Sequence, residues 1–128
     1  MRAVVLAAAV AVAWSNGASA QDAGAGEKVF AACKPCHQIG ETAKNSVGPV
    51  LNGLIGRRAG SVAGYAYSDA NKNSGLTWDD ATFTDYIKEP RAKIPGTKMV
   101  YAGLKDEAKI KDLLAFLKQL GADGKKTP

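Results

Sequence analysis

The sequence predicts a small all-α domain made of short helices and long loops. Three stretches, residues 23–33, 77–89 and 105–120, show helix boundaries or apolar side chains at helical spacing. Between the first two, residues 38–73 are dominated by Gly, Asn, Ser and Thr. No stretch alternates convincingly at a period of two, and no internal repeat is visible. These observations argue against a sheet protein and against a repeat protein.

The first predicted helix, residues 23–33, is short and carries Val29 and Phe30 among small residues. It ends at Cys33, where the run CKPCH (residues 33–37) begins. This helix would therefore deliver the CKPCH run to the rest of the domain.

The region that follows, residues 38–73, reads as turns and Ω-type loops. Its glycines are Gly40, Gly48, Gly53, Gly56, Gly60 and Gly64. A loop stretch of this length is ordinarily evidence against a compact domain. A large apolar cofactor, around which the loops could wrap, removes that objection.

The second predicted helix starts at a run resembling a capping box, Thr77 to Asp80, and ends near Glu89 because Pro90 stops it. The residues expected on its buried face are Ala81, Phe83, Tyr86 and Ile87.

The last predicted helix, residues 105–120, shows the clearest pattern. Its apolar side chains recur every three or four residues, at Ile110, Leu113, Leu114, Leu117 and Leu120. Gly121 follows as a stop signal. The remaining polar stretch, residues 121–128, is expected to be frayed.

Residues 1–20 have the pattern of a cleavable signal peptide. Arg2 supplies a positive charge, residues 3–14 an apolar stretch, and Ala18 to Ala20 a small-residue cleavage site. A retained membrane anchor is the alternative, but the apolar stretch is shorter than the about 20 residues that span a bilayer. We therefore expect export to the periplasm and a single mature domain, residues 21–128, whose first residue, Gln21, could cyclise.

The CKPCH run is the pattern of a c-type haem attachment site. The thiols of Cys33 and Cys36 would add to the two vinyl groups of one haem, and His37 would bind the iron. These are the only cysteines and the only histidine. Two alternatives are a zinc site, for which the chain offers too few Cys and His ligands, and a redox dithiol, whose βαβ setting is absent.

Met99, the only methionine besides Met1, is the candidate for the second axial ligand. It follows a Pro95-Gly96 turn that could hold an extended segment against a flat cofactor. Core packing is the usual role of a single Met. Thioether ligation would raise the reduction potential, and an iron with both axial positions filled favours electron transfer over catalysis.

The formal net charge is +5 and becomes +4 when Arg2 leaves with the signal peptide. The chain has no Arg-rich stripe and no known nucleic-acid motif, which argues against nucleic-acid binding. A cationic exported protein more plausibly meets acidic protein surfaces.

Four segments together resemble the class I cytochromes c, specifically the bacterial cytochrome c2 branch close to mitochondrial cytochrome c. The matching runs are CKPCH at 33–37, VGPVLNGLIGR at 47–57, YSDANKNSGLTW at 67–78 and IPGTKMVYAG at 94–103. The resemblance implies the cytochrome c fold, with its first and last helices crossing near the haem attachment site.

The resemblance also implies roles for individual residues. The carbonyl of Pro49 would accept the His37 ring N–H. Hydrogen bonds to the haem propionates would come from Arg57, Tyr67 and Trp78, although the two aromatic residues could equally fill the core. A polar network beside the Met ligand would comprise Asn71, Tyr86 and Thr97, each of which has an alternative role as a local turn or helix residue.

Two positions depart from the mitochondrial pattern. Tyr101 stands where those proteins have Phe, and its hydroxyl could make the haem edge wetter. Phe30 lies one residue closer to Cys33 than usual, which indicates a small shift in the connection between helix and haem. Neither departure removes a ligand.

The implied function is a soluble, monomeric one-electron carrier between a bc1-type complex and a photosynthetic reaction centre or terminal oxidase. Its partners would offer acidic docking surfaces to cationic side chains around the haem edge; the candidates are Lys34, Lys44, Arg91, Lys93, Lys98 and Lys105. The alternative is a haem enzyme or sensor, peroxidase-like, whose Met99 dissociates.

Overall fold

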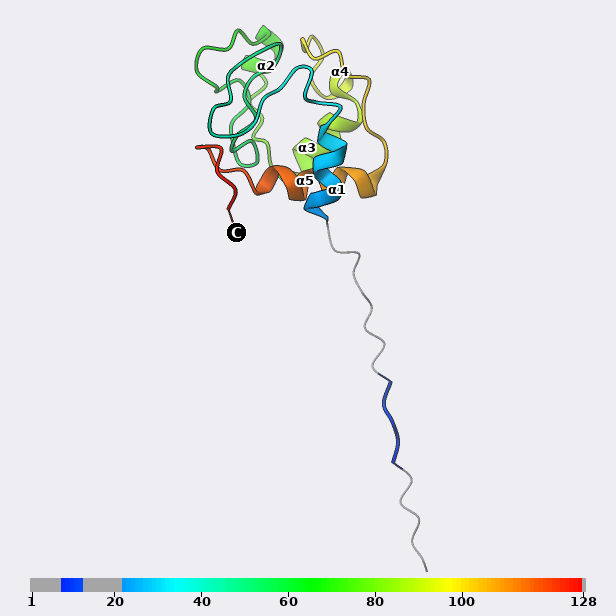
Figure 1. The fold of residues 1–128 in the computed structure, drawn as a ribbon. Helices are drawn as coiled ribbons and strands as arrows, with labels where there is room; N and C mark the ends of the chain where they lie inside the picture. Colours follow the sequence, from blue (N-terminus) through cyan, green and yellow to red (C-terminus); the bar gives the residue numbers. More distant parts are fainter. Residues whose placement is uncertain (1–7, 13–21, 128) are drawn as a thin grey trace, which may run out of the picture.

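The computed structural model describes residues 8–12 and 22–127, and Figure 1 shows helices joined by long loops. The described residues form five helices: α1 (Ala23–Phe30), α2 (Asp69–Lys72), α3 (Asp80–Lys88), α4 (Pro90–Lys93) and α5 (Glu107–Lys118). Their extended pairing is limited to two isolated β-bridges, Arg58 with Thr77 and Leu120 with Lys126. The predicted all-α class with long loops is therefore confirmed. The expected signal peptide lies outside the described residues except for 8–12.

Helices α1 and α5 cross at one side of the molecule and form its main helix–helix contact (Figure 1). At the crossing, a Cβ on Gly26 would lie 1.9 Å from the backbone oxygen of Asp112. The rings of Phe30 and Phe116 meet beside it, with their centroids 5.5 Å apart. The absence of a side chain at residue 26 therefore allows the two helices to approach closely.

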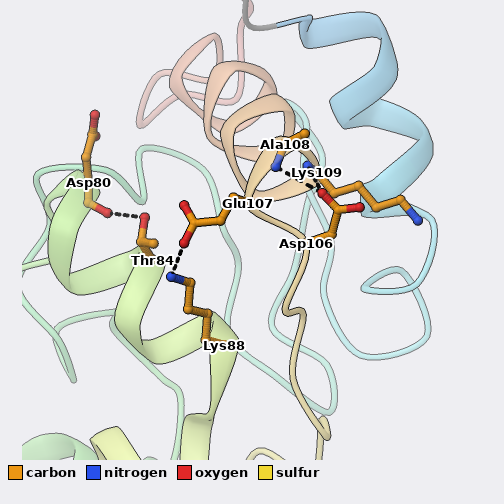
Figure 2. Close-up of polar contacts among 7 residues, drawn as sticks. All are labelled: Asp80, Thr84, Lys88, Asp106, Glu107, Ala108 and Lys109. Atoms are coloured by element: carbon orange, nitrogen blue, oxygen red, sulfur yellow. Dashed lines mark hydrogen bonds and ion pairs between the residues drawn. The ribbon is translucent and has the colours of Figure 1, made fainter.

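Each of these two helices begins at an aspartate that caps it. The Asp22 carboxylate accepts from the amides of Gly24 and Ala25, and the Asp22 amide donates to Asp112 Oδ1 at 2.9 Å. Just before α5, Asp106 Oδ1 accepts from the amides of Ala108 and Lys109 (Figure 2). These caps satisfy amides that have no partner inside the helix.

Helix α3 starts two residues later than the predicted capping box. Its N-cap is Asp79, whose Oδ1 accepts from the Thr82 amide at 2.7 Å, whereas Thr77 pairs with Arg58 in a bridge. The predicted buried face is also partly wrong, because Ala81 is exposed. Figure 2 shows how Lys88, near the end of α3, forms an ion pair with Glu107 at the start of α5.

Pro90 ends α3 as expected, but it also begins α4 at a position where a missing amide costs no hydrogen bond. Helix α2 falls inside the predicted loop region and is capped by Ser68, which accepts from the Asn71 amide at 3.1 Å. Both helices are single turns.

The stretch that follows α5 is ordered rather than frayed, contrary to the sequence expectation. The Thr127 amide donates to the Gln119 carbonyl at 2.6 Å, and the Gly121 amide donates to Lys125 at 3.0 Å. These bonds turn residues 121–127 back along the end of α5 and beside the loop after CKPCH (Figure 1).

The apolar core gathers side chains from α1, α3, α5 and the loops between them. It contains Phe30, Leu54, Ala59, Trp78, Phe83, Tyr86, Ile87, Ile94, Ile110, Leu113, Leu114, Phe116 and Leu117. No helix in the described part of the chain is long and apolar enough to cross a membrane.

Candidate haem site

A cavity of about 310 Å³ lies among the loops and opens to solvent at one edge. Its walls are mainly apolar, with Leu51, Leu54, Leu113 and Leu117 contributed by the long loop and by α5. All the site residues expected from the sequence line this one cavity: Cys33, Cys36, His37, Pro49, Arg57, Tyr67, Asn71, Trp78, Tyr86, Thr97 and Met99. Residues that are far apart in the sequence thus meet around a single space.

Cys33 and Cys36 lie on the turns that continue α1. The amides of Cys36 and His37 donate to the Cys33 carbonyl at 3.1 and 2.9 Å, which wraps the CKPCH run tightly. Both thiols are free and half-buried. Burial raises the pKa of the Cys33 thiol, and the neighbouring Cys36 adds to the rise.

The His37 ring is held by the loop that precedes Pro49. Its Nδ1 lies 2.8 Å from the Pro49 carbonyl oxygen. Because a carbonyl can only accept, Nδ1 carries the proton and Nε2 of the neutral ring keeps a free lone pair. Burial lowers the pKa of His37, although the bond to Pro49 opposes this, and the Arg57 charge lowers it further. A neutral imidazole is the form that binds a metal.

Met99 is fixed by two hydroxyl groups. Tyr86 Oη donates to Met99 Sδ at 3.4 Å and lies 3.0 Å from Thr97 Oγ1, which in turn accepts from the Met99 amide at 3.3 Å. Burial raises the pKa of Tyr86, against the opposing bond with Thr97, and keeps the phenol protonated as a donor. The sulfur therefore has one lone pair engaged and another free in the cavity.

Arg57 is anchored at one end and unsatisfied at the other. Its Nη1 donates to the carbonyls of Val50 and Asn52 at 3.0 and 3.1 Å. Its Nε is buried with no partner, and so is Oδ1 of Asn71 on the same cavity. Buried polar atoms normally have partners. Two unsatisfied atoms in one cavity indicate that the site takes a group with polar edges, or water around it.

The two expected aromatic donors differ in what they do. Trp78 is 7% exposed and packs on Tyr86, with ring centroids 4.9 Å apart. Tyr67 Oη accepts from the Val62 amide at 3.0 Å, and its ring meets Tyr65 edge-on. Both therefore support the cavity wall through contacts of their own.

Three residues that support the cavity were missed from the sequence. A Cβ on Gly48 would lie 2.3 Å from the His37 ring, so only glycine allows this close approach. Tyr65 donates to the Val47 carbonyl at 2.7 Å, and Asn45 bonds both Ala63 O and the Val50 amide. These residues tie two loops together. Their roles appear only in the three-dimensional structure, where the two loops meet. Gly48 is the one with a sequence signal, because it lies in the run VGP that matches the family.

The open edge of the cavity carries exposed apolar side chains, and Lys98 also lines the cavity. Val47 and Val100 are 69% and 76% exposed, and Tyr101 is half-buried beside them. Burial raises the pKa of the Tyr101 phenol, and the nearby Cys33 adds to the rise. Tyr101 therefore places a neutral hydroxyl group at the edge of the cavity. The sequence predicts that this hydroxyl makes the edge wetter than the Phe of mitochondrial cytochromes c.

Some of the candidate docking lysines already have local partners. Lys98 donates to the Ala66 carbonyl at 2.6 Å, Lys93 lies 3.5 Å from Asp85, and Lys105 lies 4.0 Å from Glu89. In the part of the chain that the structure describes, no ion pair involves the others, Lys34, Lys44 and Arg91.

A covalent attachment motif, a lined cavity and helices crossing beside it define a c-type haem protein. A family model described as Cytochrome c matches residues 23–121. The chain is 61% identical to cytochrome c2 of Blastochloris viridis over 122 residues, covering 95% of this chain and 92% of that protein. It is 60% identical to cytochrome c-550 of Bradyrhizobium diazoefficiens, covering 80% and 76% of the two chains.

Solved structures agree with these relatives. Cytochrome cH from Methylobacterium extorquens superposes with a TM-score of 0.73 at 52% identity, covering 77% of this chain and 98% of that one. Cytochrome c2 from Rhodospirillum centenum gives a TM-score of 0.75 at 38% identity, covering 78% and 98%. The chain therefore belongs to the cytochrome c family, in its class I bacterial cytochrome c2 branch. It is an electron-transfer protein rather than an enzyme, and carries one covalently attached c-type haem at Cys33 and Cys36.

Proposed function

We propose that His37 and Met99 are the axial ligands of this haem, and that the protein carries single electrons between membrane redox complexes of the periplasm. The observation that carries the proposal is the matched pair of ligand atoms on one cavity. His37 Nε2 is left free by the bond to Pro49, and Met99 Sδ is oriented by Tyr86. When bound, the haem supplies a one-electron ferric/ferrous couple.

The residues of the chain have distinct tasks in this function. Pro49 fixes the imidazole tautomer and its orientation, which strengthens a ligand nitrogen. Tyr86 withdraws electron density from the Met99 sulfur and so favours the ferrous state. The apolar walls exclude water and disfavour the extra positive charge of ferric iron. Arg57, Trp78 and Tyr67 would face the propionates, with the free Nε of Arg57 the best-placed donor.

The charge and the apolar edge support a transient docking role. Lys34, Lys44 and Arg91 are exposed, and Val47 and Val100 offer apolar contact at the mouth of the cavity. Cationic side chains steer the encounter with an acidic partner, and a small contact area permits rapid release. The donor would be a bc1-type complex, and the acceptor a photosynthetic reaction centre or a terminal oxidase.

The periplasmic location depends on the signal-peptide pattern of residues 1–20, with a mature domain from Gln21. Mass spectrometry of the protein from its host would test this proposal. A mature mass that starts at Gln21 with one haem supports it, and a chain that retains residues 1–20 contradicts it.

Met99→Ala tests the ligand assignment. Loss of the thioether should lower the reduction potential and let added cyanide or imidazole bind the iron rapidly, because one axial position becomes available. Potentiometry and absorption spectra of the ferric protein would measure both effects. Val100→Ala, the adjacent exposed residue, serves as the control and should leave both unchanged. An unchanged potential and spectrum in Met99→Ala would show that another group is the distal ligand.

The haem enzyme alternative has no support in the comparisons, since the relatives are cytochromes of the electron-transfer type. The zinc alternative also lacks support: among residues 8–12 and 22–127, no three His, Cys, Asp or Glu side chains gather as a metal site.

A further inference from the structure

The segment after α5, residues 121–127, is built as a turn rather than a free end; we call it the tail segment. Its Gly121 amide donates to the Lys125 carbonyl at 3.0 Å, and Thr127 donates through its amide and hydroxyl to the Gln119 carbonyl at 2.6 and 3.2 Å. A polar stretch whose one apolar side chain, Ala122, is exposed gains little from such order by itself. The order of the tail segment must therefore come from the part of the protein against which it packs.

The tail segment packs on the loop that follows CKPCH. Gly124 has a φ of +78°, and a Cβ there would lie 2.2 Å from the carbonyl carbon and oxygen of Gly40 and 2.7 Å from the Glu41 amide nitrogen. One residue before the tail segment, the Leu120 carbonyl accepts from the Gly53 amide at 3.1 Å. The chain after α5 thus contacts the loop through its backbone at Gly40 and again at Gly53. The exposed ion pair of Lys125 with Glu41, at 3.8 Å, adds little stability.

From this loop, a short chain of hydrogen bonds reaches the haem cavity. Asn52 holds Gly40 with both ends of its side chain, since Oδ1 accepts from the Gly40 amide at 2.9 Å and Nδ2 donates to its carbonyl at 2.7 Å. The Asn52 backbone carbonyl then accepts from Arg57 Nη1 at 3.1 Å. Arg57 lines the cavity with its buried, unpartnered Nε.

We propose that the tail segment is a clasp that positions Arg57 through Gly40 and Asn52, and thereby raises the reduction potential of the haem. The inference rests on the proposed role of Arg57 beside the propionates. A guanidinium held at a fixed place offsets propionate charge that would otherwise stabilise ferric iron. If the clasp loosens, the loop around Asn52 moves, water reaches the guanidinium, and the ferric state gains stability.

The test compares two glycine substitutions in the same segment of the holoprotein. Gly124→Ala places a methyl group against the Gly40 backbone at a positive φ, whereas the nearest contact of a Gly121 Cβ is the flexible Asp123 carboxylate at 3.1 Å. At the applied potential that half-oxidises the wild type, we expect the ferric-to-ferrous ratio of Gly124→Ala to rise about threefold, the fold-change that corresponds to weakening one hydrogen bond of ordinary net strength. Gly121→Ala should match the wild type.

A second variant and a second readout make the test independent of one substitution. A chain ending at Asp123 lacks the clasp contacts without adding a clash, and should shift the ratio in the same direction. Hydrogen exchange of Arg57 Nε–H, followed by NMR, should be faster in both clasp variants. Ile110→Val, a buried α5 change away from the cavity, controls for simple loss of stability and should alter neither readout.

Arg57→Gln separates this inference from the proposed function on which it rests. If Arg57→Gln lowers the potential while both clasp variants keep the wild-type ratio and exchange rate, the clasp is wrong and the role of Arg57 survives. If Arg57→Gln leaves the potential unchanged, the proposed role of Arg57 fails and the route through it fails as well. Equal shifts of the ferric-to-ferrous ratio in Ile110→Val and Gly124→Ala would show that the effect comes from lost stability alone. That result would contradict the proposed role of the tail segment.

Discussion

At the scale of single residues, the position of His37, the proposed haem ligand, depends on a glycine packed behind its ring. This glycine is Gly48, where an added Cβ would lie 2.3 to 2.8 Å from three atoms of the His37 ring. Its amide also donates to the Cys36 carbonyl at 2.8 Å, so the backbone itself forms a wall behind the ring. Protein interiors of this density cannot absorb an extra methyl group without movement.

Gly48→Ala should therefore displace the His37 ring and lengthen or break its bond to Pro49. We expect overpacking to lower the free energy of unfolding by about 1–3 kcal/mol, together with a perturbed ferric spectrum. Thermal unfolding and NMR of the His37 Nδ1 proton would measure the two effects. Gly24→Ala, in the exposed first turn of α1, is the matched control: it should not lower the free energy of unfolding and should leave the His37 signal unchanged. A native His37 signal in Gly48→Ala would contradict the packing argument.

The sequence proposes the chemistry-bearing residues, which the structure brings to one cavity, but it does not reveal the residues that orient them. Cys33, Cys36 and His37 identify themselves by spacing, and Met99 by being the remaining soft ligand. Asn45 and Tyr65, by contrast, act by bonding carbonyls eighteen residues away. No local pattern encodes such contacts, because they exist only once two loops have closed around the cavity.

At the scale of helices and loops, capping decides where each helix begins. Asp79 rather than Thr77 caps α3, since only Asp79 has an extended backbone immediately before the first helical residue and a carboxylate that reaches the Thr82 amide. The hydrogen bonds from the Thr82 backbone and side chain lower the pKa of Asp79, and the charge of Lys93 lowers it further. The carboxylate is thus more stable in the folded protein than in the unfolded chain.

Asp79 should make α3 sensitive to acid. A carboxyl whose folded pKa is lowered stabilises the fold above its unfolded pKa of about 3.9. That contribution is lost as the pH falls through the lower, folded value. Asp79→Ala should therefore lower the midpoint of thermal unfolding at neutral pH, and the difference from wild type should shrink in acid. Asp69→Ala is the control, because the structure shows no hydrogen bond or ion pair of that exposed carboxylate among the described residues, and its difference from wild type should not change with pH. A constant difference across pH for Asp79→Ala would contradict the cap assignment.

The longer helices were predictable because they bury a periodic face, and the short ones were not. Helix α5 shows apolar residues at helical spacing, and the buried set adds only Phe116 to those expected. Helices α2 and α4 have four residues each, too few for a periodic signal. The sequence predicts that the tail segment frays, because the segment is polar. Its order comes instead from backbone contacts with Gly40 and Gly53, which leave no pattern in the sequence.

At the scale of the whole molecule, two helices and a cofactor cavity replace a conventional large core. Helices α1 and α5 cross (Figure 1). Cys33, just after α1, and Leu113 and Leu117 of α5 line the same cavity. The long loops are tolerated because they wrap this space and close on each other through side-chain bonds. The glycine-rich stretch and the attachment motif together predict this arrangement of long loops around a cofactor.

The excess of positive charge should appear in the kinetics of electron transfer. The net charge of +5 includes only Arg2 from the expected signal peptide, so the mature domain remains cationic. Exposed charges more than a Debye length apart, about 10 Å at 0.1 M salt, are largely screened. We expect the second-order rate constant with an isolated bc1-type complex or reaction centre to fall about tenfold or more between about 0.01 M and 0.3 M salt.

A pair of charge reversals would locate the steering surface. Lys44→Glu changes an exposed charge on the loop that leads to the cavity edge, whereas Lys111→Glu makes the same change on α5 beside Asp80 and Asp85. Flash or stopped-flow kinetics at low salt should show a slower reaction for Lys44→Glu and little change for Lys111→Glu. Equal slowing by both variants would mean that net charge alone attracts the partner, and a rate indifferent to salt would exclude cationic steering altogether.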